Sequence, residues 1–393
     1  MLIKPKTRGF ICTTAHPDGC AQNVRSQIAY AKQQKNGVRR FQNALIIGAS
    51  TGYGLSSAIA AAYSCGANVL GVAFERNAHK GRTATAGFYN SAAFLHETAK
   101  DGLFARMLMG DAFADQTKQK ALDILADQMG AVDLLIYSLA APVRTLPETG
   151  ARISSTLKPI GQDYVSKNVD IQSGQVSEVR LPPATQEEID NTITVMGGDD
   201  WQRWVSALKE RSLLADDATT IAYSYIGPSI THPIYKDGTI GRAKQHLKQT
   251  ADSLHGKNGV SAYVSVNKAV VTQSSSAIPV VPLYISILFK VMQEKGCHEG
   301  CIQQICRLAQ RLTQPSPTDS EGYIRMDDWE MRADIQDEVM RRWQLVNSDN
   351  IASLADLSAY NAEFLSLFGF GVEGIDESLE TNEVADETNM ILL

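Results

Sequence analysis

The sequence feature that most constrains the fold is a glycine-rich turn between two apolar runs. Residues 43 to 47 read NALII, residues 48 to 54 read GASTGYG, and the alanine-rich LSSAIAAAYSCG follows up to Gly66. The first run predicts a buried strand, and the second predicts a helix with Gly66 as its C-cap. Strand, glycine turn and helix in this order are typical of a dinucleotide-binding fold, where free N–H groups at a helix N-terminus hold a pyrophosphate.

Gly48, Gly52 and Gly54 allow the backbone to approach a pyrophosphate, because a Cβ would block that approach. Their spacing departs from the simpler G-x-G-x-x-G form, so a purely structural turn remains an alternative. Glu75 ends the next apolar run about 20 residues later, where a carboxylate binds the ribose hydroxyls of adenosine. This favours NADH over NADPH. Alternatively, Glu75 pairs with Arg76, which could itself bind a 2′-phosphate.

Strand-like and helical segments then alternate along the chain. We expect strands in ANVLGVAF (67–74), GLFARMLMG (102–110), VDLLIYSLA (132–140), TTIAYSYIG (219–227) and VSAYVSVN (260–267), with helices at 117–129 and 239–254. This alternation predicts an α/β fold of the Rossmann type, with a doubly wound parallel sheet.

The domain organisation follows from where this rhythm begins and breaks. We expect an N-terminal extension over residues 1–42 that packs on the core, and a decorated Rossmann-type catalytic domain over 43–376. An insertion over about 143–215 should carry short strands and then helices containing Trp201 and Trp204. The acidic residues 377–393 should form a disordered tail.

Composition argues for a small-molecule substrate in the cytoplasm. The net charge is −6 and no long Lys/Arg block occurs, so nucleic acid and anionic membranes are poor candidate partners. The apolar stretch 278–289 is too short for a bilayer span, which takes roughly 20 residues. Six cysteines and an N-terminus without a signal-peptide core fit a reducing compartment. The spacing of Cys297, Cys301 and Cys306 does not favour a metal site.

Tyr235 and Lys244 are candidates for the chemistry. Hydride transfer to a double bond conjugated to a carbonyl produces an enolate, which needs a donor at the oxygen and a group that fixes the nicotinamide. Nine residues at about 100° each would put the two on opposite helical faces, so Asp237 and Gly238 should break the chain between them. Tyr235 then lies on a loop and Lys244 in the first helical turn. An ordinary tyrosine and a surface lysine are the alternative.

At these residues the chain resembles the FabV-type enoyl-acyl carrier protein reductases and the related trans-2-enoyl-CoA reductases of the short-chain dehydrogenase superfamily. Their Tyr and Lys are also separated by eight residues. The resemblance covers nearly the whole chain, through RGFICTTAHPDGC, GASTGYG, LIYSLAAP, YSYIGP, the Tyr235 to Lys244 segment, VNKAVVTQSSSAIPVVPLY and RMDDWEMR.

The resemblance implies a monomeric NADH-dependent enzyme that reduces the C2–C3 double bond of enoyl-acyl carrier protein or enoyl-CoA in fatty acid synthesis. Tyr235 would be the proton donor or enolate-stabilising residue, with a pKa lowered by Lys244, and Lys244 would bind the nicotinamide ribose. Tyr225 and Ser276 would contact the acyl substrate. The cofactor site would comprise Gly48, Ala49, Ser50, Thr51, Gly52, Tyr53, Phe74, Glu75, Asp111, Ala112, Leu139, Ala140, Lys244, Val271, Thr272, Gln273, Ser274 and Ser275.

Several alternatives stay open at this point. Asp111 could bind the adenine amino group or simply cap a helix. The apolar helix expected after Ile278 could border the acyl chain or belong to the core. The same Tyr and Lys would also serve a carbonyl reductase of the short-chain dehydrogenase class, and a non-catalytic NADH sensor would need only the nucleotide site.

Overall fold

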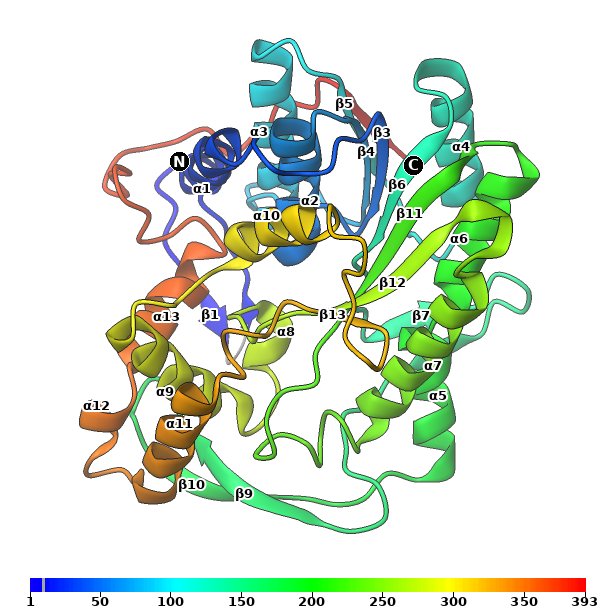
Figure 1. The fold of residues 1–393 in the computed structure, drawn as a ribbon. Coiled ribbons are helices and arrows are strands. Elements are labelled where there is room, and N and C mark those ends of the chain that lie inside the picture. The colour runs from blue at the N-terminus through cyan, green and yellow to red at the C-terminus, as the bar shows by residue number, and fades with distance from the viewer. Residues whose placement is uncertain (9–10) are drawn as a thin grey trace.

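The computed structural model describes residues 1–8 and 11–393 and places eight strands in one central sheet (Figure 1). The strand order is β13-β12-β11-β6-β3-β4-β5-β14, and all neighbours are parallel. The strands are β3 (Asn43–Ile47), β4 (Asn68–Ala73), β5 (Ala105–Met109), β6 (Val132–Tyr137), β11 (Leu214–Ser224), β12 (Ser261–Val266), β13 (Tyr323–Arg325) and β14 (Met390–Leu392). The predicted Rossmann-type doubly wound sheet is confirmed.

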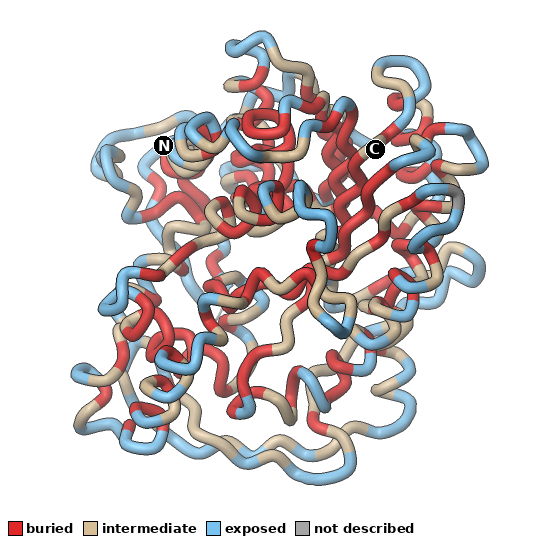
Figure 2. Tube along the Cα trace, viewed as in Figure 1, coloured by how far each residue is buried: buried red, intermediate tan, exposed pale blue. Residues whose placement is uncertain are grey.

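The central strands are apolar throughout because both faces of the sheet are covered. All five residues of β3 are buried, and Figure 2 shows the sheet as the buried centre of the molecule. Side chains alternate between the faces along a strand. Accordingly, Ala44 and Ile46 pack into one apolar cluster, whereas Leu45 and Ile47 pack into the other.

Each cluster is completed by its own set of helices. One face carries α1 (Pro17–Gln33), α2 (Gly52–Ala60), α3 (Ala86–Lys100) and α10 (Cys301–Arg311), and the other carries α4 (Asp115–Gln128), α6 (Asp199–Glu210) and α7 (Thr239–Leu254) (Figure 1). Helix α2 continues through a π-helical turn to Gly66, whose φ of 77° makes it the expected C-cap.

The segment between β6 and β11 holds two antiparallel hairpins followed by helices. The hairpins are β7 (Val143–Thr145) with β8 (Arg152–Ser154), and β9 (Tyr164–Val169) with β10 (Val176–Leu181). Helix α5 (Gln186–Met196) packs on α7, and α6 buries Trp201 and Trp204 completely. Short strands followed by helices with these tryptophans are as predicted.

A second group of helices lies beyond the sheet, next to the hairpin of β9 and β10 (Figure 1). It consists of α8 (Gln273–Ser276), α9 (Val281–Glu294), α11 (Ala333–Leu345), α12 (Ile351–Leu354) and α13 (Leu357–Ser366). Helix α9 contacts α8, α11, α13 and β9, and its apolar side chains are almost all buried. Near the N-terminus, β1 (Thr7–Arg8) pairs with β2 (Ile11–Cys12). None of the described helices is both long and apolar enough to cross a bilayer.

The expectation of a disordered tail over 377–393 is wrong for the last residues. Met390–Leu392 form β14, which pairs in parallel with β5, and the Leu393 N–H donates to the carbonyl of Met109 at 3.1 Å. The Tyr89 hydroxyl also donates to the Glu383 carbonyl at 2.6 Å. The acidic residues dominated the composition of this segment, but its apolar end, MILL, satisfies the backbone groups that the β5 edge would otherwise expose.

Candidate active site

The candidate residues gather at one edge of the sheet because each follows the carboxyl end of a parallel strand. The glycine turn follows β3, Phe74 and Glu75 follow β4, and Asp111 follows β5. Leu139 and Ala140 follow β6, Tyr225 follows β11, and residues 271–276 lie beyond β12. The connections diverge between β3 and β6, and in open α/β sheets this is where a crevice forms for ligands.

The turn after β3 requires its glycines for steric reasons. Gly48 has a φ of 84°, and a Cβ there would lie 2.4 Å from the Ser138 carbonyl oxygen. A Cβ at Gly54 would lie 1.8 Å from the Gly48 carbonyl oxygen. Helix α2 begins at Gly52 directly after the turn, so its first N–H groups face the crevice without intrahelical partners. The turn therefore has the construction of a phosphate-binding loop.

Glu75 lies beside this turn at the end of β4. Its Oε1 accepts a hydrogen bond from the Ser50 hydroxyl at 2.6 Å, and a Cβ on Gly87 would come within 2.0 Å of the same oxygen. Within residues 1–8 and 11–393, no cation pairs with Glu75, so the proposed pairing with Arg76 is not formed. Phe74 next to it is 80% exposed, which leaves an aromatic face free for a ligand.

A cavity of about 350 Å³ lies between Phe74 and Asp111. Asp111 accepts from the Phe113 N–H at 3.0 Å, whereas Ala114 is the N-cap residue of α4, so Asp111 is not a plain helix cap. The C-terminal Leu392 and Leu393 also line this cavity. The sequence analysis missed these two leucines because it treated the tail as disordered.

A larger cavity of about 1740 Å³ adjoins the glycine turn. Thr51 and Gly52 line it, as do Glu75 and residues 271–273 from the loop after β12. That loop is locked by a capping box in which the Ser275 N–H donates to Thr272 Oγ1 at 2.9 Å and the Ser275 hydroxyl accepts from the Thr272 N–H at 2.8 Å. Two segments far apart in the sequence thus share one cleft, large enough for an extended dinucleotide.

Tyr235 lies on a loop and Lys244 on α7, as predicted, but α7 begins at Thr239, so Lys244 is in its second turn. The loop is tight: a Cβ on Gly238 would lie 2.6 Å from the Ile234 carbonyl oxygen, and a Cβ on Gly241 would lie 1.9 Å from that of Lys236. The Thr239 N–H donates to the Lys158 carbonyl at 3.0 Å. The inserted segment therefore holds the loop in place.

The Lys244 ammonium donates one hydrogen bond, to the Tyr223 carbonyl at 3.0 Å at the end of β11. No described carboxylate lies within 4 Å of it. Burial lowers the pKa of Lys244 to about 8, because the charged form loses hydration without gaining a counter-ion. Its other donors bond to no described residue.

Tyr235 is buried and packs edge-on against Tyr225, with 4.9 Å between ring centroids. Burial raises the pKa of Tyr235 well above its ordinary value, and the nearby Tyr360 and Glu330 raise it further. The pKa of Tyr235 is thus raised, against the expectation that Lys244 lowers it. Tyr235 is therefore a neutral phenol at physiological pH. Its hydroxyl donates to no described residue.

Other buried polar groups surround this pair of tyrosines. The Ser276 hydroxyl lies 2.8 Å from that of Tyr360. Glu330, Tyr284 and Lys268 are buried close by, and sequence reasoning assigned none of them a role. Glu330 belongs to the RMDDWEMR segment that was noted for its resemblance, but a run of charged residues reads as a solvent-facing surface until its burial is known.

Comparisons with known proteins cover almost the whole chain. Residues 2–80 match the NAD(P)H binding domain of trans-2-enoyl-CoA reductase, and residues 82–313 match the trans-2-enoyl-CoA reductase catalytic region. An enoyl-[acyl-carrier-protein] reductase [NADH] of Flavobacterium psychrophilum is 52% identical over 100% of both chains. One of Coxiella burnetii is 53% identical over 96% of this chain and 95% of the relative. The chain belongs to the trans-2-enoyl-CoA reductase family.

Solved structures of the trans-2-enoyl-CoA reductase family agree with this fold. The Treponema denticola trans-2-enoyl-CoA reductase in complex with NAD superposes with a TM-score of 0.95 at 44% identity, covering 98% of this chain and 99% of that one. The Clostridium acetobutulicum trans-2-enoyl-CoA reductase in complex with NADH gives a TM-score of 0.92 at 40% identity, with 98% of each chain covered.

A third family model, the enoyl reductase FAD binding domain, matches residues 318–380. These residues do not fit a flavin dinucleotide. In the turn after β13, Asp327 and Asp328 already pair with Arg325 and Arg307, Glu330 accepts from Tyr225 and Tyr284, and no glycine turn opens a helix in this described segment. Ile324, Phe364 and their apolar neighbours pack into the core instead. We assign no flavin to this member of the family.

Gly52 and Gly54 of the turn should differ in their tolerance of a methyl group. Gly54→Ala must displace the turn, because the new Cβ would overlap the Gly48 carbonyl, so dinucleotide binding should be lost. The new Cβ of Gly52→Ala would contact nothing, so its only cost is the positive φ of 51°, which should lower the stability by about 1 to 2 kcal/mol. Thermal unfolding and NAD titration by fluorescence would measure both. Equal loss of NAD binding in the two variants would contradict this steric account.

Proposed function

We propose that this chain catalyses the NADH-dependent reduction of the C2–C3 double bond of trans-2-enoyl thioesters, on acyl carrier protein or coenzyme A, as the last step of the fatty acid elongation cycle. One observation carries the proposal: the free hydroxyl of a buried, neutral Tyr235 lies at the same sheet edge as the glycine turn. The names of its relatives, enoyl-[acyl-carrier-protein] reductase [NADH] and trans-2-enoyl-CoA reductase, support it.

The cofactor site would extend along the carboxyl edge of the sheet. Residues 48–53 would hold the pyrophosphate, Phe74 and Glu75 the adenosine, and Asp111 and Ala112 the adenine. Residues 139–140 and 271–275, with Lys244, would surround the nicotinamide ribose. A 2′-phosphate would meet the Glu75 carboxylate, which favours NADH. Bound NADH supplies a hydride from nicotinamide C4 to the β-carbon of the substrate.

Tyr235 would act on the substrate oxygen. Negative charge develops on the thioester oxygen as the β-carbon accepts hydride, and a donor placed there stabilises the transition state more than the ground state. Tyr235 is suited to this role because its hydroxyl is protonated and donates to no described residue. The enolate then takes a proton at the α-carbon, from the Tyr235 hydroxyl or from water, which gives the saturated thioester. Tyr225 and Ser276 would contact the acyl group, and the apolar α9 behind them would border its chain.

Monomeric state and a cytoplasmic location belong to the same proposal. The family resemblance supports the first. The composition and the few cysteines support the second. Sedimentation of the purified protein would test the monomer directly.

The reaction class can be tested by loss of NADH absorbance with crotonyl-CoA. We expect enoyl-dependent oxidation that is faster with NADH than with NADPH. A panel of ketones without the enoyl group serves as the control. Turnover of ketones alone would indicate a carbonyl reductase, and NADH binding without turnover of either substrate would indicate a sensor.

Tyr235→Phe should lower kcat with crotonyl-CoA by about 10² or more, because it removes a donor that matters mainly in the transition state. NADH affinity should stay close to that of the wild type. Tyr263→Phe is a matched control, since Tyr263 lies in the body of β12 with its ring on His255. An undiminished kcat in Tyr235→Phe would refute the assignment.

NADH binding should weaken as pH rises through about 8, where Lys244 loses its proton. The sign follows from the lowered pKa of Lys244. The side chain is fully protonated well below pH 8 and becomes a neutral amine above it. Lys244→Arg should bind more weakly at neutral pH but remove the inflection, because a guanidinium stays charged. The measurement is the NADH dissociation constant from pH 6.5 to 9.5. The same inflection in both proteins would exclude Lys244 as its source.

A further inference from the structure

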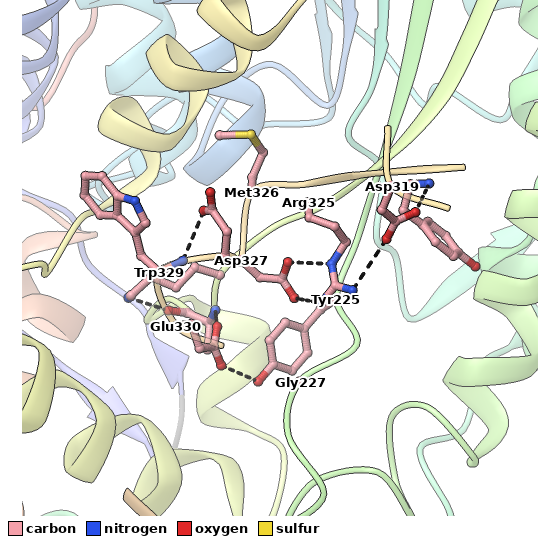
Figure 3. A network of polar contacts seen from close by, with 12 residues as sticks. Tyr225, Gly227, Asp319, Arg325, Met326, Asp327, Trp329 and Glu330 are labelled. Carbon is pink, nitrogen blue, oxygen red and sulfur yellow. Dashed lines mark hydrogen bonds and ion pairs between the residues drawn. The ribbon is translucent and has the colours of Figure 1, made fainter. Parts of the chain in front are cut away.

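Glu330 is a fully buried carboxylate that bonds to Tyr225 (Figure 3) and joins three segments of the chain. Its Oε1 accepts from the Tyr225 hydroxyl at 3.1 Å, after β11, and from the Tyr284 hydroxyl at 2.5 Å, on α9. Its Oε2 accepts from the Ala269 N–H at 2.7 Å, after β12. The three segments that it links all border the candidate substrate site.

Such a carboxylate is costly unless its bonding capacity is filled. Burial raises the pKa of Glu330, while the Tyr284 hydrogen bond and the charge of the buried Lys268 oppose that rise. Stability alone gives little reason to keep it, because apolar residues of similar volume often replace buried charges without loss. Its bonding pattern, rather than its contribution to stability, is therefore the feature that needs an explanation.

The bond to Tyr225 restricts what that tyrosine can offer. A phenol has one proton, and Tyr225 gives it to Glu330, so only its lone pairs remain for a substrate. The hydroxyl is confined from another side by Gly227, whose φ is 71° and where a Cβ would lie 2.6 Å from the Tyr225 oxygen. The ring edge is fixed at the same time against Tyr235.

We propose that Glu330 is a positioning residue, which holds Tyr225 against Tyr235 with the Tyr225 proton turned away from the substrate. Tyr235 is then the single phenol that donates to the thioester oxygen. This inference rests on the proposed function, because it assigns the division of labour within that site. Glu330 itself touches neither substrate nor cofactor.

A double-mutant cycle between Glu330→Gln and Tyr225→Phe tests the inference. Glu330→Gln should lower kcat/KM for crotonyl-CoA by about 10- to 100-fold, the scale of a misplacement of about 1 Å, with KM for NADH almost unchanged. When Tyr225→Phe is already present, adding Glu330→Gln should lower kcat/KM by less than about threefold, because no hydroxyl remains to be positioned. Multiplicative effects of the two substitutions would overturn the proposal.

Asp327→Asn is the matched control. Asp327 is also fully buried and lies three residues earlier, but both its oxygens accept from Arg325 at 2.7 Å (Figure 3), and it makes no hydrogen bond to Tyr225 in the described part of the chain. Its effect on kcat/KM should be multiplicative with that of Tyr225→Phe. Non-additivity as large as that of Glu330→Gln would show that the whole segment acts through packing, which would also overturn the proposal.

Removing one buried charge can prevent folding, because Lys268 would lose an opposing charge. The cycle is then run with Glu330→Gln combined with Lys268→Met, which removes both charges. The same non-additivity with Tyr225→Phe is expected, and multiplicative effects would again refute the role of Glu330. Turnover of crotonyl-CoA by the wild-type protein distinguishes failure of the proposed function from failure of the role of Glu330. Without turnover, both are overturned. With turnover, the function stands whatever the cycle shows.

Discussion

The parallel pairing of β3 with β6 is the constraint on which the rest of the site depends. The chain leaves the two strands in diverging directions, which is the arrangement that opens a ligand crevice in open α/β sheets. The glycine turn and the end of β6 also touch, since a Cβ on Gly48 would overlap the Ser138 carbonyl. Any side chain at that position would separate the turn from β6 and thus move the cofactor loop away from the groups that reach the crevice from β11 and α7.

Burial is the largest cause of the pKa shifts of Tyr235 and Lys244 at this edge of the sheet. It keeps Tyr235 protonated and lowers the pKa of Lys244 to about 8, and both shifts arise from lost hydration rather than from a strong ion pair. The common view of a lysine that acidifies its tyrosine requires the two groups to be close. Here the hydrogen bond of the lysine goes instead to the Tyr223 carbonyl.

Much of the fold could be read from the sequence because the signals are local. Short apolar runs at regular intervals gave the strands, and the helix at 239–254 was placed to the residue. Long-range features could not be predicted from these local signals. The pairing of β14 with β5 depends on an unfilled sheet edge nearly 300 residues away, and Glu330 is an ordinary acidic residue until three donors converge on it. Local pattern reports periodicity, whereas burial of a polar group depends on tertiary neighbours.

The filling of hydrogen-bond capacity distinguishes groups that meet a ligand from groups that hold other groups. Both oxygens of Glu330 accept hydrogen bonds from protein donors, and the Tyr225 hydroxyl donates its one hydrogen bond to Glu330. By contrast, the Tyr235 hydroxyl donates to no described residue, and the Lys244 ammonium makes one bond of the three it can donate. Buried donors left without partners are unfavourable in a folded protein. A ligand that accepts from them would remove this cost, which is consistent with the proposed roles of Tyr235 at the thioester oxygen and of the half-buried Lys244 at the ribose.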